Sequence, residues 1–240
     1  MPRSFQMVVL LIFSALLFSS TRVASQTGTQ RAAAVTFTLD FPTSQPEHYS
    51  IRVPSEGSAH YQSSGRLTAD SNDTDSHDSD SQNNDSQSND SFDMDFAVTS
   101  ETRQRIFDLA AKAGYFQKDV DSHHKGLAFT GKKTLSYKDA QRSGESTYNY
   151  SSNPAVQELS DLMQSLSATL EFGHRLQYDH RYQKLALDDE LKRMEEMARS
   201  NQLIEVAAIQ PILNQIIADQ SVMNVTRARA QRLLERAGTP

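Results

Sequence analysis

The sequence predicts an α+β protein, in which a small, mostly antiparallel sheet with packed helices precedes an all-helical C-terminal region. Short segments of the first half alternate apolar and polar residues, as half-buried strands do. Apolar residues at helical spacing follow, and the pattern stays helical to the end of the chain. We therefore expect an α+β domain over residues 35–172 and a helical region, packed on it, over residues 173–240.

The first 25 residues have the pattern of a secretory signal peptide. Arg3 precedes an apolar run from Met7 to Phe18, and small residues for cleavage stand at 23–25. The run is shorter than the ~20 residues that a membrane-spanning helix needs. Because the chain has no cysteine, whereas secreted animal domains commonly carry disulfides, we expect an exported bacterial protein, periplasmic or extracellular. Residues 26–34 would then form a flexible N-terminus.

Strand patterns lie on both sides of an acidic stretch. Residues 35–41 alternate, and residues 49–53 do so strictly before a turn at 54–57 returns the chain as a hairpin. Alternation resumes over residues 92–98. The acidic stretch is therefore expected to be a long loop between two strands.

The acidic stretch itself is rich in Asp, Ser and Asn. Residues 70–90 contain no apolar side chain, so nothing there offsets the entropy of ordering, and we expect a disordered insert over residues 63–91. A calcium loop that began at Asp73 would need glycine and glutamate where the chain has Asp78 and Asn84. The chain has a formal net charge of −6 and lacks an extended basic patch, so nucleic acid is not an expected partner.

Helix boundaries follow from capping residues. The first helix is expected to begin at Ser100 and to stop at Gly114, and Asn153-Pro154 is expected to open a second helix. Further breaks or caps are expected at Gly173, 188–189, Asn201 and Ser221.

Two features of the C-terminal region stand out. Residues 203–218 are apolar in almost every direction of a helical wheel, so we expect them to be the centre of a helical layer, kinked or split at Pro211. Arg229, Arg232 and Arg236 form a basic stripe, for which a solvated face and the docking of an anionic surface are the two interpretations.

Residues 126–134, GLAFTGKKT, share part of a phosphate-binding signature. Gly126 and Gly131 have the G-x-x-x-x-G spacing and Lys132 follows, but Lys133 occupies the position of the magnesium-binding hydroxyl. The preceding residues are polar where a buried strand would be required. We expect instead a β-hairpin with Gly131 at its turn and both lysines in solvent at its tip.

The weak candidates for metal ligands are His123, His124 and Asp121. Adjacent histidines in a strand or turn point apart, and no third ligand has the proper spacing. Glu171 and His174 form a Glu-x-x-His pair of the kind that di-iron bundles use twice, and the chain has no second productive pair. The sequence therefore predicts no catalytic residue, no cofactor and no metal.

In its arrangement of strands and helices, the chain resembles a family of uncharacterised exported bacterial proteins. The sheet of that family begins with a Tyr-x-Ile-x-Val strand that turns through glycine to a second tyrosine, here Tyr49, Ile51, Val53, Gly57 and Tyr61. The resemblance covers about residues 35–170. It implies a fold and export, and no activity, because the family has none assigned.

Taken together, these patterns favour a non-catalytic binding or interaction module of the cell envelope, with an unknown protein or other envelope component as partner. Two alternatives stay open. One is a periplasmic enzyme, metal-assisted through the His123–His124 loop or through Glu171 and His174. The other is a structural protein that self-associates through its C-terminal helices. No integral membrane segment is expected after signal cleavage.

Overall fold

The computed structural model describes residues 32–42, 44–65 and 90–238. The predicted signal peptide and most of the predicted acidic insert lie outside these residues. The strands are β1 Ala34–Asp40, β2 His48–Pro54, β3 Ala59–Gly65, β4 Asp90–Phe96, β5 Lys132–Lys138 and β6 Ser143–Tyr148. The helices are α1 Ser100–Lys112, α2 Pro154–Tyr182, α3 Leu187–Arg199, α4 Gln210–Ala218 and α5 Asn224–Ala237, with 3₁₀ turns η1 Gly114–Phe116 and η2 Val206–Ile209.

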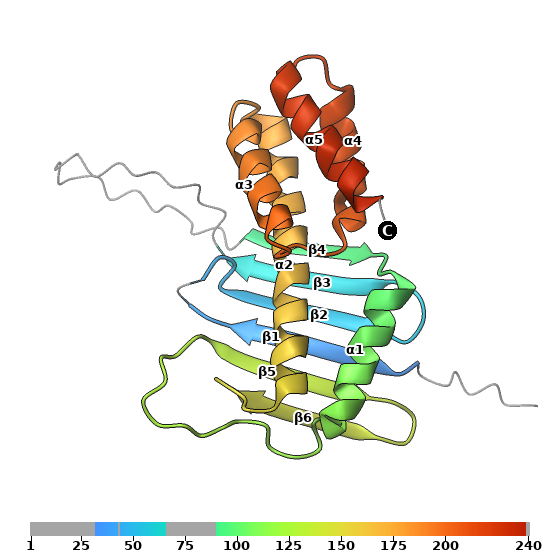
Figure 1. The fold of residues 1–240 in the computed structure, drawn as a ribbon, viewed down its shortest axis with the longest axis vertical. Helices are drawn as coiled ribbons and strands as arrows, with labels where there is room; N and C mark the ends of the chain where they lie inside the picture. The colour runs from blue at the N-terminus through green and yellow to red at the C-terminus, as the bar shows by residue number, and fades with distance from the viewer. Residues whose placement is uncertain (1–31, 43, 66–89, 239–240) are drawn as a thin grey trace, which may run out of the picture. The chain divides into compact units, whose positions relative to one another are not determined.

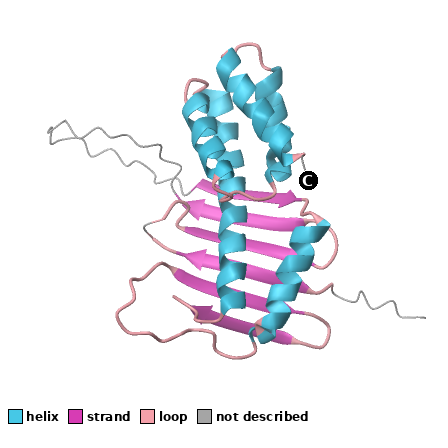
Figure 2. Cartoon of the chain, in the orientation of Figure 1, coloured by secondary structure: helices cyan, strands magenta, loops and turns pink. Residues whose placement is uncertain are grey.

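The six strands form one antiparallel sheet in the order β4-β3-β2-β1-β5-β6. Helices α1 and α2 lie across one face of this sheet, and α3, α4 and α5 form a helical region beyond β4 (Figures 1 and 2). The structure thus confirms the predicted α+β class and the mainly helical C-terminal region. The sheet is antiparallel throughout, where the sequence predicted a mostly antiparallel one.

Alternation along the strands builds the core on the helix-covered face. Every second residue of β1 is buried there, and the residues between them, such as Thr36 and Thr38, are half-exposed on the other face. The first half of α2 adds an apolar stripe to this core. The stripe consists of Val156, Leu159, Met163, Leu166 and Leu170. An antiparallel sheet with one solvated face is stable because only the covered face must be apolar.

Both strands beside the acidic insert are longer than predicted. Ser63 to Gly65 belong to β3 and pair with Phe92 to Asp90 of β4, so the range 63–91 includes residues of both strands. Backbone pairing extends over these polar positions because the hydrogen bonds of the ladder join backbone groups and do not require apolar side chains. Ser63 is buried and donates a hydrogen bond to Glu171, which stabilises the extension.

The hairpin predicted at Gly131 is wrong. Residues 127–130 form no strand, and β5 pairs with β1 and β6 instead. Its real hairpin partner is β6, through a turn in which Asp139 accepts hydrogen bonds from the amides of Gln141 and Arg142. Leu135 and Tyr137 were correctly placed on the buried face of a strand, because that prediction depends only on alternation.

Helix α2 continues through Gly173, where a break was predicted. It runs for 29 residues, about 44 Å at 1.5 Å per residue. A Cβ at position 173 would lie 2.5 Å from the Ile209 side chain, so glycine is required there by close packing. Its helix-weakening effect, roughly 1 kcal/mol, is small beside the burial on both sides of it.

Other predicted boundaries differ by a few residues. Thr99, rather than Ser100, accepts the capping hydrogen bond of α1 from the Thr102 amide. Asn153 caps α2 as predicted. Ser221 does not cap the last helix, because its hydroxyl donates to Asp219 and α5 begins only at Asn224.

The segment 203–218 packs into the helical region on one side, whereas Pro211, Asn214 and Gln215 are exposed, so the prediction of a segment covered on most sides is confirmed only in part. Its fully or almost fully buried side chains are Leu203, Ile209, Ile212, Leu213 and Ile216. Pro211 lies in the first turn of α4, and the segment is split there into η2 and α4. Proline is tolerated at this position because the first helical turn has no acceptor for its missing amide.

The predicted basic stripe on α5 is mostly engaged within the protein. Arg229 donates to Asp188 and to Glu195, and Arg232 donates to Glu195. Glu195 is buried between α3 and α5, so these arginines neutralise an internal carboxylate. The stripe therefore joins two helices, and only Arg236 lies at the exposed end of α5 away from this network.

Replacing Ile216 by aspartate should lower the free energy of unfolding by about 4 kcal/mol or more, because the change removes packing and buries an unpaired charge. Asn214→Asp adds the same charge at an exposed position of α4 and should change stability by less than about 0.5 kcal/mol. Urea unfolding followed by circular dichroism measures both. Equal stability of the Ile216→Asp variant and the wild type would contradict the burial of this helix.

Candidate functional site

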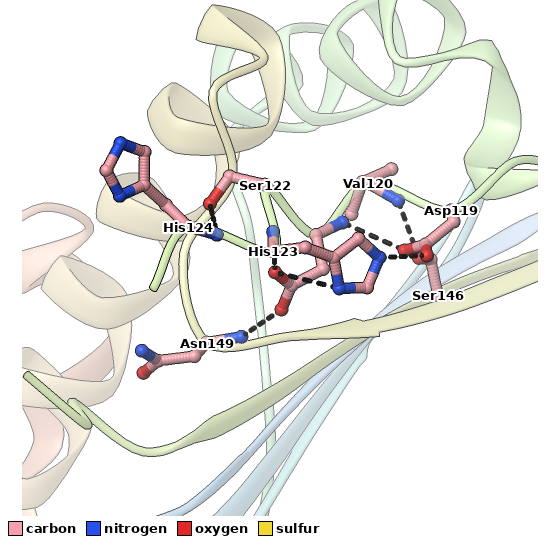
Figure 3. Close-up of polar contacts among 8 residues, drawn as sticks. Asp119, Val120, Ser122, His123, His124, Ser146 and Asn149 are labelled. Carbon is pink, nitrogen blue, oxygen red and sulfur yellow. Dashed lines mark hydrogen bonds and ion pairs between the residues drawn. The ribbon is translucent and has the colours of Figure 1, made fainter. Parts of the chain in front are cut away.

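The connection between η1 and β5 follows the free edge of the sheet. It meets β6 and the two residues that follow β6 through three hydrogen bonds. Val120 N donates to Ser146 Oγ at 3.0 Å, and Asn149 N donates to an Asp121 carboxylate oxygen at 2.9 Å (Figure 3). Ser122 N donates to Tyr150 O at 2.9 Å. Edge strands leave backbone groups without partners, and a covering segment satisfies part of that need. Asp121 is therefore a structural residue of this edge.

The two histidines of this connection have different surroundings. His123 Nε2 lies 2.7 Å from Asp119, and its amide donates to Asp121, whereas His124 points away from both carboxylates (Figure 3). The hydrogen bond with Asp119 raises the pKa of His123. The pKa of Asp119 is lowered, mainly by the hydrogen bond from the Asp121 amide and then by the bond with His123. Within the described residues, no group of three or more His, Asp or Glu side chains could hold a metal ion.

Asn149 holds the second half of the connection in place. Its side-chain oxygen accepts from the Thr130 amide at 2.9 Å, and its side-chain nitrogen donates to Ala128 O at 3.1 Å. One side chain thus gives residues 128–130 the pair of bonds that a neighbouring strand would supply. Sequence reasoning gave no role to Asn149, because only the fold brings it beside a segment about twenty residues away.

Lys133, predicted to lie in solvent, is buried beneath this connection. Its ammonium group donates to Thr130 O, Thr130 Oγ1 and Asn149 O at 2.9–3.2 Å. Burial lowers the pKa of Lys133, and the nearby charge of Asp161 opposes that shift. Lys133, in the phosphate-like signature, therefore holds the loop in place through its ammonium group, and the Thr130 amide already donates its hydrogen bond to Asn149.

Gly131 ends the connection at a crowded point. Its φ of +98° is in the left-handed region, and a Cβ there would lie 2.7 Å from Leu39 and 2.9 Å from Phe41. Glycine is needed at this position for both reasons. The chain can then turn closely over the end of β1 before β5 begins.

The result is an anchored segment with an exposed outer side, which we call the 123–132 loop. Every residue from His123 to Thr130 is exposed, including Leu127 at 45% and Phe129 at 59%. The Phe129 ring also meets the Phe41 ring edge-on, at 5.8 Å between centroids. Two large apolar side chains therefore face solvent from a loop whose backbone is tied to the protein.

Replacing Asn149 by alanine should release the 123–132 loop and cost about 1 kcal/mol of stability, because the Thr130 amide loses its acceptor. We expect faster hydrogen exchange at Thr130. Thr147→Ala, at an exposed position of the adjoining strand, is the matched control and should leave this amide protected. Unchanged exchange at Thr130 in the Asn149→Ala protein would show that other contacts hold the loop.

A second polar cluster lies under the sheet, around Glu171 of α2. Tyr61 and Ser63 of β3 donate to one carboxylate oxygen at 2.7 Å and 2.6 Å, and His174 Nδ1 lies 3.8 Å from the other. The His174 ring stacks on Phe92, with centroids 4.0 Å apart. The predicted Glu-x-x-His pair does come together, but the sequence did not indicate the partners from β3.

The Glu171 carboxylate is held in its charged form. Burial raises the pKa of this carboxyl, and the interactions with His174, Ser63 and Tyr61 outweigh that effect, so the net pKa is lowered. Hydrogen bonds to a charged form favour it in this way. Because one oxygen already accepts two hydrogen bonds, the arrangement fits a structural anion better than a proton-transfer base.

The stability contribution of Glu171 should depend on pH. A lowered folded-state pKa gives stability that is present above the ordinary value of 4.5 and is lost as the pH falls through the folded pKa. Glu171→Gln should therefore be less stable than wild type by about 1–3 kcal/mol at pH 7, with a smaller difference at pH 3. Glu158→Gln, at an exposed position of the same helix, should show little difference at either pH in chemical unfolding.

Two shallow grooves adjoin at the connection between α3 and α4. One, of about 230 Å³, has an apolar floor that includes Leu203 and Leu233, and Arg236 lies at its edge. The other, of about 410 Å³, lies along α2 beside the exposed Arg105–Glu158 ion pair. In the first groove the Thr99 hydroxyl, which caps α1, donates to the Glu205 carboxylate at 2.6 Å. Neither groove is lined by the 123–132 loop.

Comparisons with known proteins found no matching family model, no matching curated protein and no matching solved structure. Arguments about function therefore depend on the geometry of this chain.

Proposed function

We propose that the protein is a non-catalytic interaction module of the cell envelope, and that the 123–132 loop is its contact surface. The observation that carries the proposal is the exposure of Leu127 and Phe129 on a loop fixed by Asn149 and Lys133. Single exposed apolar residues are ordinary, whereas grouped ones mark interaction sites. A fixed backbone also reduces the entropy lost on binding.

The polar groups favour binding over catalysis. Asp119, Asp121 and His123 bond to one another or to the β6 edge, and Glu171 already accepts from Tyr61 and Ser63. Groups committed to structural hydrogen bonds are poor candidates for acid–base or metal chemistry. The metal-assisted alternative is therefore less favoured than the interaction module.

Export and the envelope location are part of the proposal. Both depend on the signal-peptide pattern of residues 1–25. No helix among the described residues combines the length and the apolar character that crossing a bilayer requires. The resemblance to exported bacterial proteins over residues 35–170 points to the same location.

Self-association is a second candidate, favoured by the far end of α2. Tyr182 is 62% exposed and Leu185 is 80% exposed, and the Tyr178 and Tyr182 rings lie 5.1 Å apart. Lys184 and His180 fasten this end to Asp219. A second copy of the chain would cover these side chains.

A photo-crosslinking amino acid at position 127 tests the contact surface in cells that express the full chain. We expect a covalent adduct at 127 that is not formed when the same amino acid replaces the exposed Gln220. Placed at 185, it should give an adduct of twice the chain mass only if the second candidate is correct. The interaction-module proposal fails if position 127 yields no adduct with any protein or lipid.

A further inference from the structure

The surroundings of Leu127 and Phe129 indicate the chemistry of the partner. No acidic residue occurs between positions 122 and 132, whereas Lys125, Lys132, His123 and His124 lie there. Lys125 and Lys132 are exposed. The protein as a whole is acidic, with a net charge of −6, so the 123–132 loop is a local exception.

Three acidic groups beside the loop are already engaged, and a fourth, Asp161, lies near enough to Lys133 to act on its charge. Asp119 and Asp121 are hydrogen bonded to His123, and Asp121 also accepts from the Asn149 amide. Asp40, which faces Lys132 across the β1–β5 ladder, binds His48 at 2.5 Å. These carboxylates reduce the local positive charge, but their oxygens do not hold Lys125 or Lys132.

We propose that the 123–132 loop docks on an anionic phospholipid surface, with Leu127 and Phe129 at the headgroup–acyl boundary and Lys125 and Lys132 near lipid phosphates. This inference deepens the proposed function and rests on it. Exposed apolar side chains flanked by cations are the chemistry of reversible interfacial binding. A lipid surface accepts such side chains without a matching pocket.

The position of the loop favours lipid over an acidic peptide. A peptide of extended form is usually held in a groove or paired to an open strand edge. The two grooves described above are lined by other segments, and the β6 edge beside the loop is partly covered by residues 120–122. The exposed run 123–130 instead faces outward from its anchors on Asn149 and Lys133.

Flotation of the purified exported protein with vesicles tests the proposal. One vesicle preparation contains phosphatidylglycerol and phosphatidylethanolamine in equal parts, and the other contains phosphatidylcholine alone. We expect binding to the anionic vesicles that weakens as salt is added, and little binding to the neutral ones. Equal binding to both preparations, or none to either, would overturn the lipid assignment.

Two pairs of variants locate the contact. Leu127→Ser with Phe129→Ser should weaken vesicle binding about tenfold or more, because the apolar surface no longer enters the interface. Lys125→Gln and Lys132→Gln should each weaken it about fivefold. Met223→Ser with Val225→Ser, two exposed apolar residues at the start of α5, is the matched control and should bind as wild type does. Wild-type binding by the Leu127–Phe129 variant would contradict the placement.

The two proposals can fail separately. The lysine variants keep the loop anchors intact, so their result stands even if the serine variant proves misfolded by circular dichroism. If vesicles are not bound but position 127 crosslinks to a protein, the lipid partner is wrong and the interaction module stands. If vesicles are not bound and position 127 crosslinks to nothing, both proposals fail.

Discussion

The close contact between Gly173 and Ile209 is the constraint on which the rest of the fold depends. Because position 173 has no side chain, η2 packs directly against α2, and α2 continues without a break. Its first half covers the sheet, and its second half packs against the helical region (Figure 1). One helix therefore belongs to two layers, and the sheet and helices share a core.

The same continuity explains the buried Glu171. Glu171 stands two residues before Gly173, close to where α2 leaves the sheet, and Tyr61 and Ser63 of β3 reach its carboxylate. A buried carboxylate is costly unless its hydrogen bonds are made. Here those bonds connect α2 to β3. They lie toward the C-terminal part of β3, which is the part that extends into the range predicted as the insert. The polar cluster thus fixes the register of the two layers.

Periodicity in the sequence predicted most of the fold, and the two largest failures have one physical cause. The α+β class, the β2–β3 hairpin, the Asn153 cap and the burial of Ile216 depend on contacts between near neighbours or on alternation. The break at Gly173 and the hairpin at Gly131 were wrong because distant residues, Ile209 and Leu39, decide those positions. The candidate ligands His123 and Asp121 do meet, as parts of an anchored loop.

The 123–132 loop shows why such a surface is hard to recognise from sequence. Its backbone is fixed by Lys133 from below and by Asn149 from the side, and both anchors are polar residues without a motif. An unanchored loop would be free to bury Leu127 and Phe129 against the sheet edge, because the burial of apolar surface lowers the free energy. Anchoring prevents that movement, so both side chains remain largely exposed although Phe129 also contacts Phe41.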